Sequence, residues 1–153
     1  MEMHVSREIQ APSERVWAIL TDLEGSPTTL SGVERVERLD GGNGFAVGTR
    51  WRETRVMFGR EATEEMEVTA LLDGRSYTVT ADGGNTNYTS VLQVEPLDGE
   101  RCRLSMSFSA APSGIAAKLL GATVGRLFQK ATRTMLQRDL DDIARRAEAA
   151  PAE

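Results

Sequence analysis

The hydrophobic period of the chain changes once, near Pro112, and this change most constrains the fold. Upstream of Pro112, apolar residues alternate with polar ones between turn-forming residues, a period of two that is typical of half-buried strands. From Ser113 to about Ala149 the period becomes about 3.6, which predicts one long amphipathic helix. Its apolar stripe consists of Ile115, Leu119, Leu120, Val124, Leu127, Ala131, Met135 and Ile143.

The N-terminal region predicts a strand followed by two short helical segments. Met3–Ile9 alternates apolar and polar residues as a strand does. Pro12 suits the first turn of a helix, where no N–H is needed, and an apolar stripe continues to Leu20. A second short helical or irregular segment runs through Leu30, and a strand follows at Val33–Leu39.

One turn suggests how the next two strands pair. Gly59-Arg60, taken as a two-residue turn with glycine first, pairs Trp51 with Val68 and Arg55 with Glu64. This register gives one mostly apolar face and one polar face with complementary charges, and a slip of one residue would scramble both.

A second turn extends the same sheet. Asp73-Gly74 is a strong hairpin signal that pairs Val68 with Val79 and Ala70 with Tyr77. Loops at residues 40–44, 82–85 and 96–101 separate the remaining strands, so the sequence predicts an α+β fold with a seven-stranded antiparallel sheet. A curved sheet with one long helix across it cannot close perfectly, and we expect an interior cavity in the gap.

Composition excludes several classes of function. The 153 residues fit one domain, 1–149, with a frayed tail at 150–153. A net charge of −5 argues against nucleic acid, which needs a basic face. Cys102 and His4 are the only residues of their kinds, which leaves no intrachain disulfide, no Cys/His zinc cluster and no Ser-His-Asp triad of ordinary design. No basic-then-apolar leader and no apolar run near 20 residues is present, so we expect a cytoplasmic protein without integral membrane association.

Three segments resemble one known superfamily. Ile9–Trp17, Gly48–Glu53 and Phe58–Glu64, together with the order of elements, are similar to the START-like, helix-grip (SRPBCC) superfamily, and within it to the polyketide cyclase/dehydrase and lipid-transport group. The resemblance implies a sheet wrapped around the C-terminal helix and a cavity for a hydrophobic or amphiphilic small molecule. It implies no shared catalytic set, and we expect no metal and no cofactor.

The candidate site residues lie on the inward face of the predicted strands and helix. Glu53 and Glu64 are the candidate acids or bases, because burial can raise a carboxyl pKa, and Arg55 opposite Glu64 would pair with it. Alternatively, Arg55 and Glu64 lie at the solvated end of the hairpin, where an ion pair contributes little. The predicted ligand-binding residues are Trp51, Glu53, Arg55, Met66, Val68, Tyr77, Val79, Tyr88, Ser90, Leu92, Met106, Phe108, Leu120 and Leu127. Ordinary core packing is the alternative for most of them.

The charges of the long helix have two interpretations. Arg126, Lys130 and Arg133 recur at helical spacing and could meet anionic lipid headgroups. A solvated face is the simpler interpretation, because Asp139, Asp141 and Asp142 follow closely and cancel the charge.

Three functions are compatible with these features. The first is non-covalent binding of a small hydrophobic ligand such as a lipid, a polyketide or an isoprenoid-like compound. The second is a cyclase, aromatase or dehydratase that uses a cavity carboxylate, and the third is an interaction module with a vestigial cavity. The enzyme hypothesis requires Glu53 or Glu64 to be buried and to face the cavity. The sequence leaves the ligand's identity and the oligomeric state open.

Overall fold

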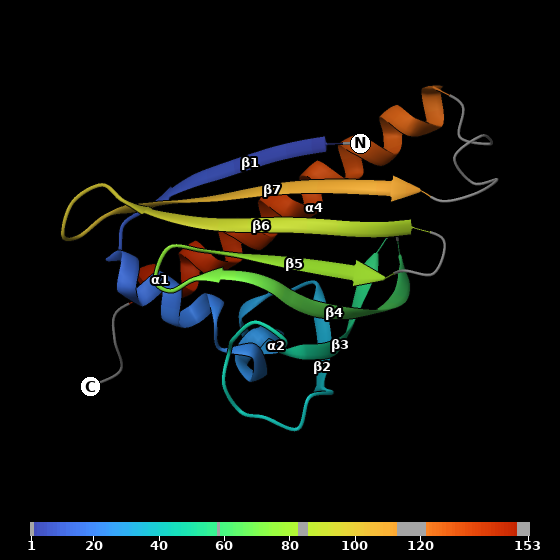
Figure 1. Ribbon diagram of the computed structural model, residues 1–153. Helices are drawn as coiled ribbons and strands as arrows, with labels where there is room; N and C mark the ends of the chain where they lie inside the picture. The colour runs from blue at the N-terminus through green and yellow to red at the C-terminus, as the bar shows by residue number, and fades with distance from the viewer. Residues whose placement is uncertain (1, 58, 83–85, 113–121, 150–153) are drawn as a thin grey trace.

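The computed structural model describes residues 2–57, 59–82, 86–112 and 122–149 and confirms the predicted α+β architecture (Figure 1). Seven strands form one antiparallel sheet in the order β1-β7-β6-β5-β4-β3-β2. Their bounds are β1 Glu2–Ile9, β2 Val33–Arg38, β3 Arg50–Met57, β4 Arg60–Leu72, β5 Ser76–Asp82, β6 Thr86–Pro96 and β7 Cys102–Pro112. The helical elements are α1 Ser13–Leu20, the short 3₁₀ helix η1 Leu23–Gly25, α2 Ser26–Thr29 and α4 Ala122–Glu148.

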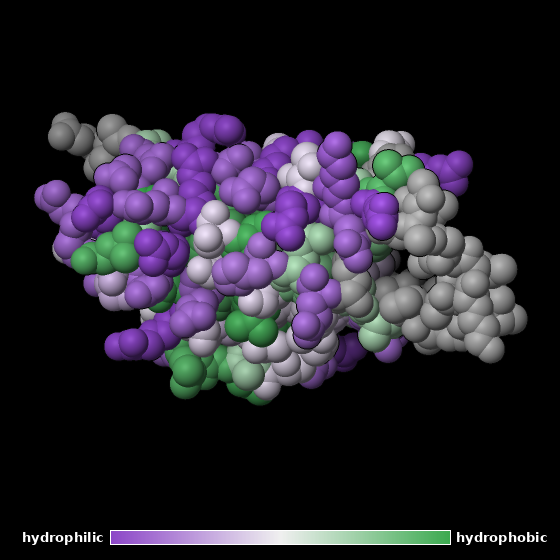
Figure 2. All heavy atoms as spheres, turned by 90° about the horizontal axis from the view of Figure 1, so that it is seen from above, coloured by the Kyte–Doolittle hydropathy of each residue, from purple (hydrophilic) through white to green (hydrophobic). Residues whose placement is uncertain are grey.

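The long helix α4 crosses one face of the curved sheet, while α1 and α2 lie beside it near one end (Figure 1). The inner face of α4 consists of apolar residues at helical spacing, among them Leu136, Leu140, Ile143 and Ala147. They meet the inward residues of the strands in one continuous core. Seen from above, hydrophilic residues cover most of the described surface, and hydrophobic ones form small separate groups (Figure 2).

The β3–β4 hairpin has a different register from the predicted one. Met57 pairs with Arg60, so Arg60 belongs to β4 and the predicted Gly59-Arg60 turn is wrong. Gly59, directly before β4, has a φ of +78°, a value that glycine adopts without strain. Trp51 therefore pairs with Met66, not Val68. Because the shift is two residues, every side chain keeps its predicted face and only its partner changes.

The predicted β4–β5 pairing of Val68 with Val79 is confirmed, but the predicted pairing of Ala70 with Tyr77 is wrong. A bulge between Val68 and Ala70 adds one residue to β4, so Leu71 pairs with Tyr77. Ala70, predicted to face inward, is exposed as a result.

The described part of the long helix begins at Ala122. Residues 113–121, which include the predicted stripe residues Ile115, Leu119 and Leu120, lie outside the described residues. Of the helices in the described ranges, none is both long enough and apolar enough to cross a membrane.

Candidate functional site

A cavity of about 160 Å³ lies between the inner face of the sheet, the α1–α2 segment and α4. This volume resembles the ~150 Å³ of an apolar cavity that accommodates benzene. The strands β3 to β7 supply most of its wall, with Trp51, Glu53, Arg55, Met57, Glu64, Met66, Tyr77, Val79, Ala81, Tyr88, Ser90, Leu92, Met106 and Phe108. The helical segments and the loop before β3 complete it with Ile19, Leu20, Leu23, Ser26, Thr29, Leu30, Phe45, Met135, Leu136, Asp139 and Ile143.

Most predicted site residues lie in this wall. The predicted residues that line the cavity are Trp51, Glu53, Arg55, Glu64, Met66, Tyr77, Val79, Tyr88, Ser90, Leu92, Met106 and Phe108. Their role in binding remains a prediction. Leu120 lies outside the described residues.

Val68 and Leu127 do not line the cavity and are corrections to the predicted wall. Val68 is fully buried in the packed core beside the β4 bulge. Leu127 is 64% exposed. It precedes the buried Leu136 by nine residues, which is about two and a half helical turns and places it on the opposite face of α4.

Arg55 is the centre of the polar end of the cavity. Its Nε donates a hydrogen bond to Glu53 Oε2 at 3.2 Å, and its Nη1 donates one to Asp139 Oδ2 at 3.1 Å. The side chain is only 12% exposed, so the alternative in which Arg55 lies at the solvated end of the hairpin is wrong. The predicted pairing of Arg55 with Glu64 is also wrong, because the two-residue shift places Glu64 opposite Glu53. Arg55 thus joins β3 to α4.

Burial changes the acidity of three groups in the wall. Burial raises the pKa of Asp139 to about 6, and the Glu53 charge adds to this while Arg55 opposes it. Burial also raises the pKa of Glu64, reinforced by the charge of Glu53 and opposed by that of Arg55. The pKa of the Tyr77 hydroxyl is raised by burial above its ordinary value. Asp139 and Glu64 can therefore hold a proton closer to neutral pH than ordinary carboxyls do.

Several polar atoms at the cavity have no partner within the described ranges. Asp139 Oδ1 and Trp51 Nε1 are buried and make no hydrogen bond there. No hydrogen bond or ion pair among the described side chains reaches the Glu64 carboxylate either. A buried polar atom without a partner is costly, so Asp139 Oδ1 and Trp51 Nε1 each have capacity for a further hydrogen bond.

Phe45 covers one side of the cavity from the loop between β2 and β3. Its ring centroid lies 4.9 Å from that of Tyr77, edge to face, and 6.4 Å from that of Trp51. All three aromatic rings line the cavity. They supply a wall that suits a flat apolar ring.

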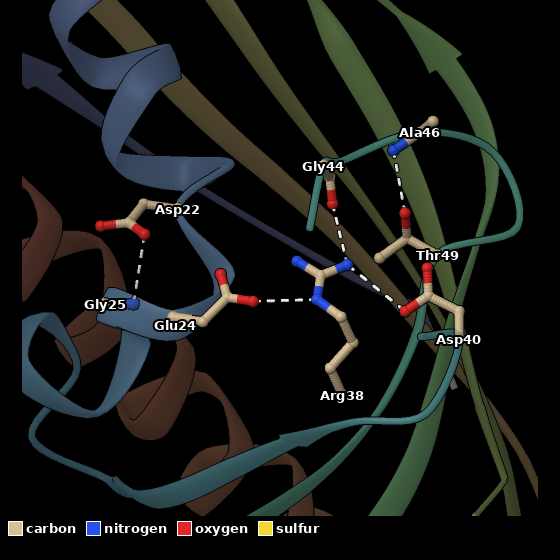
Figure 3. Close-up of polar contacts among 8 residues, drawn as sticks. All are labelled: Asp22, Glu24, Gly25, Arg38, Asp40, Gly44, Ala46 and Thr49. Carbon is tan, nitrogen blue, oxygen red and sulfur yellow. Dashed lines mark hydrogen bonds and ion pairs between the residues drawn. The ribbon is translucent and has the colours of Figure 1, made fainter. Parts of the chain in front are cut away.

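Arg38 holds this loop against η1, as Figure 3 shows. Its Nε donates to Glu24 Oε1 at 2.8 Å, and its Nη1 donates to the carbonyl of Gly44 at 2.9 Å and to Asp40 Oδ1 at 3.3 Å (Figure 3). Because Gly44 directly precedes Phe45, these bonds fix the position of the aromatic ring over the cavity.

Asp139 and Phe45 are the functional candidates that sequence reasoning missed. The sequence indicates Asp139 and Asp142 only as acids that cancel the basic charge of the helix, but both are buried. Asp142 accepts hydrogen bonds from the backbone N and the Oγ of Ser31, at 2.9 and 2.8 Å. The sequence contains one sign that Asp139 is buried. Asp139 lies between Leu136 and Ile143 at helical spacing, which places an acid within the apolar stripe.

The basic residues of the helix agree better with the predicted solvated face. Arg126, Lys130 and Arg133 are exposed, and Arg133 Nη1 donates to the backbone carbonyl of His4 at 3.0 Å. Among the residues with described positions, no group of three or more His, Cys, Asp or Glu side chains is arranged to hold a metal ion.

Comparison with known proteins gives one family. The family described as polyketide cyclase / dehydrase and lipid transport matches residues 1–148. No curated protein matches the chain.

Solved structures with the same fold cover nearly the whole chain. An aromatase/cyclase from Streptomyces sp. R1128, Zhui, is 20% identical with a TM-score of 0.80 over 97% of this chain and 93% of that one. A protein from Thermus thermophilus is 25% identical with a TM-score of 0.79 over 99% of this chain and all (100%) of that one. A START superfamily protein from Mycobacterium smegmatis is 13% identical with a TM-score of 0.78 over 96% of this chain and 97% of that one. These likenesses establish a START-like, helix-grip fold.

Proposed function

Because the chain belongs to the polyketide cyclase/dehydrase and lipid-transport family, we propose that its cavity binds one small, mainly apolar molecule without forming a covalent bond. The observation that carries this proposal is the mostly apolar cavity between sheet and α4 with one charged cluster at Arg55. Ligand sites of proteins commonly combine an apolar wall with a few placed polar groups.

The driving force is the burial of apolar ligand surface. Each Å² removed from water contributes about 25 cal/mol, less the cost of ordering ligand and side chains. The charged cluster and the free Trp51 N–H then set the orientation of the ligand's polar groups. Lipids, polyketides and isoprenoid-like compounds all have such a body, and the described cavity accommodates a single ring or one end of a longer chain.

Native mass spectrometry of the protein purified from the organism that encodes it tests this proposal. A bound compound should appear as a discrete added mass. Ala81 lies in the wall on β5, so Ala81→Leu should fill the cavity and abolish the added mass. Ala70→Leu adds the same atoms at an exposed position and should retain it. Equal occupancy in the two variants would exclude the cavity as the binding site.

A second candidate function is acid–base catalysis of a cyclase or dehydratase type. The observation that favours it is the raised pKa of Asp139 and of Glu64, both in the cavity wall. One ionised carboxylate would accept a proton from a carbon between two carbonyls, and the resulting enolate would attack a second carbonyl of the same chain. A protonated carboxyl would give a proton to the alkoxide that this attack leaves. In the dehydration, a carboxylate would then remove the remaining proton from the attacking carbon while a protonated carboxyl gives one to the new hydroxyl, so that a C=C bond forms, the C–O bond breaks and water leaves.

A linear poly-β-ketone analogue distinguishes the two functions. An enzyme should convert it to a cyclic product that has lost water, and Glu64→Gln or Asp139→Asn should slow conversion more than they weaken binding. Glu65→Gln, on the exposed face of the same strand, is the matched control. Binding without conversion would support the carrier function alone.

A further inference from the structure

The charged groups in the cavity wall are unbalanced. Among the described lining residues, Glu53, Glu64 and Asp139 are carboxyl groups, whereas Arg55 is the only arginine or lysine. The side chains of Glu53 and Asp139 are nearly inaccessible to solvent. Surplus negative charge in so little water is costly unless a cation or a proton compensates it.

Arg55 is already committed to two of the three carboxylates. Its Nε is bonded to Glu53 and its Nη1 to Asp139. Within the described part of the chain no ion pair joins it to Glu64, which faces Glu53 across the β3–β4 hairpin. The surplus therefore lies at Glu64 and on the second oxygen of Asp139.

The hydrogen bonding of Asp139 gives separate evidence, beside the charge surplus, that a partner is missing. The residue is 5% exposed and lines the cavity, and its Oδ1 accepts no hydrogen bond from any described group. A cation in the cavity would compensate the charge of both carboxylates that line it, Asp139 and Glu64.

We propose, on the basis of the binding function above, that the ligand carries a protonated amine next to its apolar body, and that Asp139 and Glu64, which both line the cavity, supply the negative charge that binds it. The apolar body lies against the aromatic wall of Phe45, Trp51 and Tyr77. An ammonium group has three donors and no acceptor, which matches a site whose open positions are carboxylate oxygens. The cavity thus selects hydrophobic amines over alcohols and acids of the same shape.

Protonation of Asp139 and Glu64 is the other way to compensate the negative charge, and the release of these protons can be measured separately. Without ligand, Asp139 and Glu64 take up protons more readily than ordinary carboxyls. The charges that act on them come from Arg55 and Glu53 on β3 and, for Asp139, also from Asp142 on α4. Binding of a cation should expel such a proton into the buffer, whereas binding of a neutral molecule should not.

Three probes with one skeleton test the proposal: benzylamine, which is a cation at neutral pH, benzyl alcohol and benzoate. Titrations followed by NMR of the backbone amides should place all binding at the cavity. We expect benzylamine to bind about tenfold more tightly than benzyl alcohol, the ratio that one charge-assisted hydrogen bond supports, and benzoate to bind most weakly. Calorimetry near pH 6 in buffers of different ionisation enthalpy should show proton release with benzylamine only.

Matched variants separate the charge from the shape of the site. Glu64→Gln should bring benzylamine close to benzyl alcohol in affinity and leave the affinity for the alcohol unchanged. Glu65→Gln, exposed on the outer face, should leave the preference intact. If benzyl alcohol binds in the cavity as tightly as benzylamine, the amine proposal is overturned and the binding function stands. If none of the three probes binds, both fail.

Discussion

Arg55 on β3 and Asp139 on α4 lie 84 residues apart in the sequence, and Arg55 Nη1 donates a hydrogen bond of 3.1 Å to Asp139 Oδ2. The bond joins the sheet to the long helix at the wall of the cavity. The same guanidinium holds Glu53, so one side chain organises the polar end of the site and stabilises the contact between its two layers.

Arg55→Met should therefore destabilise the fold. The substitution leaves Glu53 and Asp139 buried without their cation, a change that costs about 3–5 kcal/mol in comparable buried pairs. Urea denaturation measures the free energy of unfolding. The control is Arg52→Met, because Arg52 pairs with Glu37 and Glu65 on the exposed face and should cost under about 1 kcal/mol. Equal losses for the two variants would show that the Arg55 cluster has no special role in stability.

The pH dependence of stability should report Asp139. Its pKa of about 6 exceeds that of the unfolded chain, near 4, so the folded state holds a proton that the unfolded state has released. This stabilisation is complete below about pH 4 and is lost as the pH rises through about 6. Asp139→Asn has no such proton.

The unfolding free energy of the unaltered protein, relative to that of Asp139→Asn, should fall by on the order of 2–3 kcal/mol from about pH 4 to about pH 7. Denaturant curves of both proteins across this range measure the difference. Parallel pH profiles would mean that the Asp139 carboxyl titrates normally and is not buried as described.

The Arg38 contacts should control how well Phe45 covers the cavity. Arg38→Gln removes the charged bonds to Glu24 and Asp40, and amide hydrogen exchange within the loop, at Ala46 and Gly48 for example, should accelerate. Affinity for benzyl alcohol should fall about fivefold, the equivalent of one aromatic contact of about 1 kcal/mol.

Arg35→Gln is the control for this change, since Arg35 is exposed on the same strand and only reaches Glu61 at 3.9 Å. It should leave both exchange and affinity unchanged. If Arg38→Gln behaves in the same way, the loop is held by packing rather than by the arginine.

The sequence predicted the sheet, the long helix and most of the cavity wall because these depend on hydrophobic period alone. In a strand of period two, the inward positions of Tyr77 and Val79 follow from alternation, and no knowledge of the neighbouring strand is needed. The same argument placed Met106 and Phe108 on the inner face of β7.

The partners of these residues required information that alternation does not contain. A glycine can occupy either position of a two-residue turn, and the two choices at Gly59 differ by a register shift that preserves every face. The choice nevertheless decides whether Glu64 faces Arg55 or Glu53. The electrostatics of the site thus depend on one turn residue.

Asp139 and Phe45 were missed for different reasons. An aspartate on a helix normally indicates the solvated face, and the ion pair that accompanies the burial of Asp139 comes from Arg55, which is distant in the sequence. Phe45 belongs to a loop without periodicity, so its position over Tyr77 depends on the Arg38 contacts and not on local pattern.

Methionine methyl NMR tests most directly whether the hollow between sheet and α4 receives a ligand. Met57, Met66, Met106 and Met135 line the cavity, whereas Met3 on β1 is buried but does not line it and provides an internal control. With benzyl alcohol bound, we predict nuclear Overhauser effects between its ring protons and the methyl groups of the lining methionines, and none to Met3. Ring contacts that are absent from all four, or that occur equally at Met3, would contradict a ligand-binding cavity.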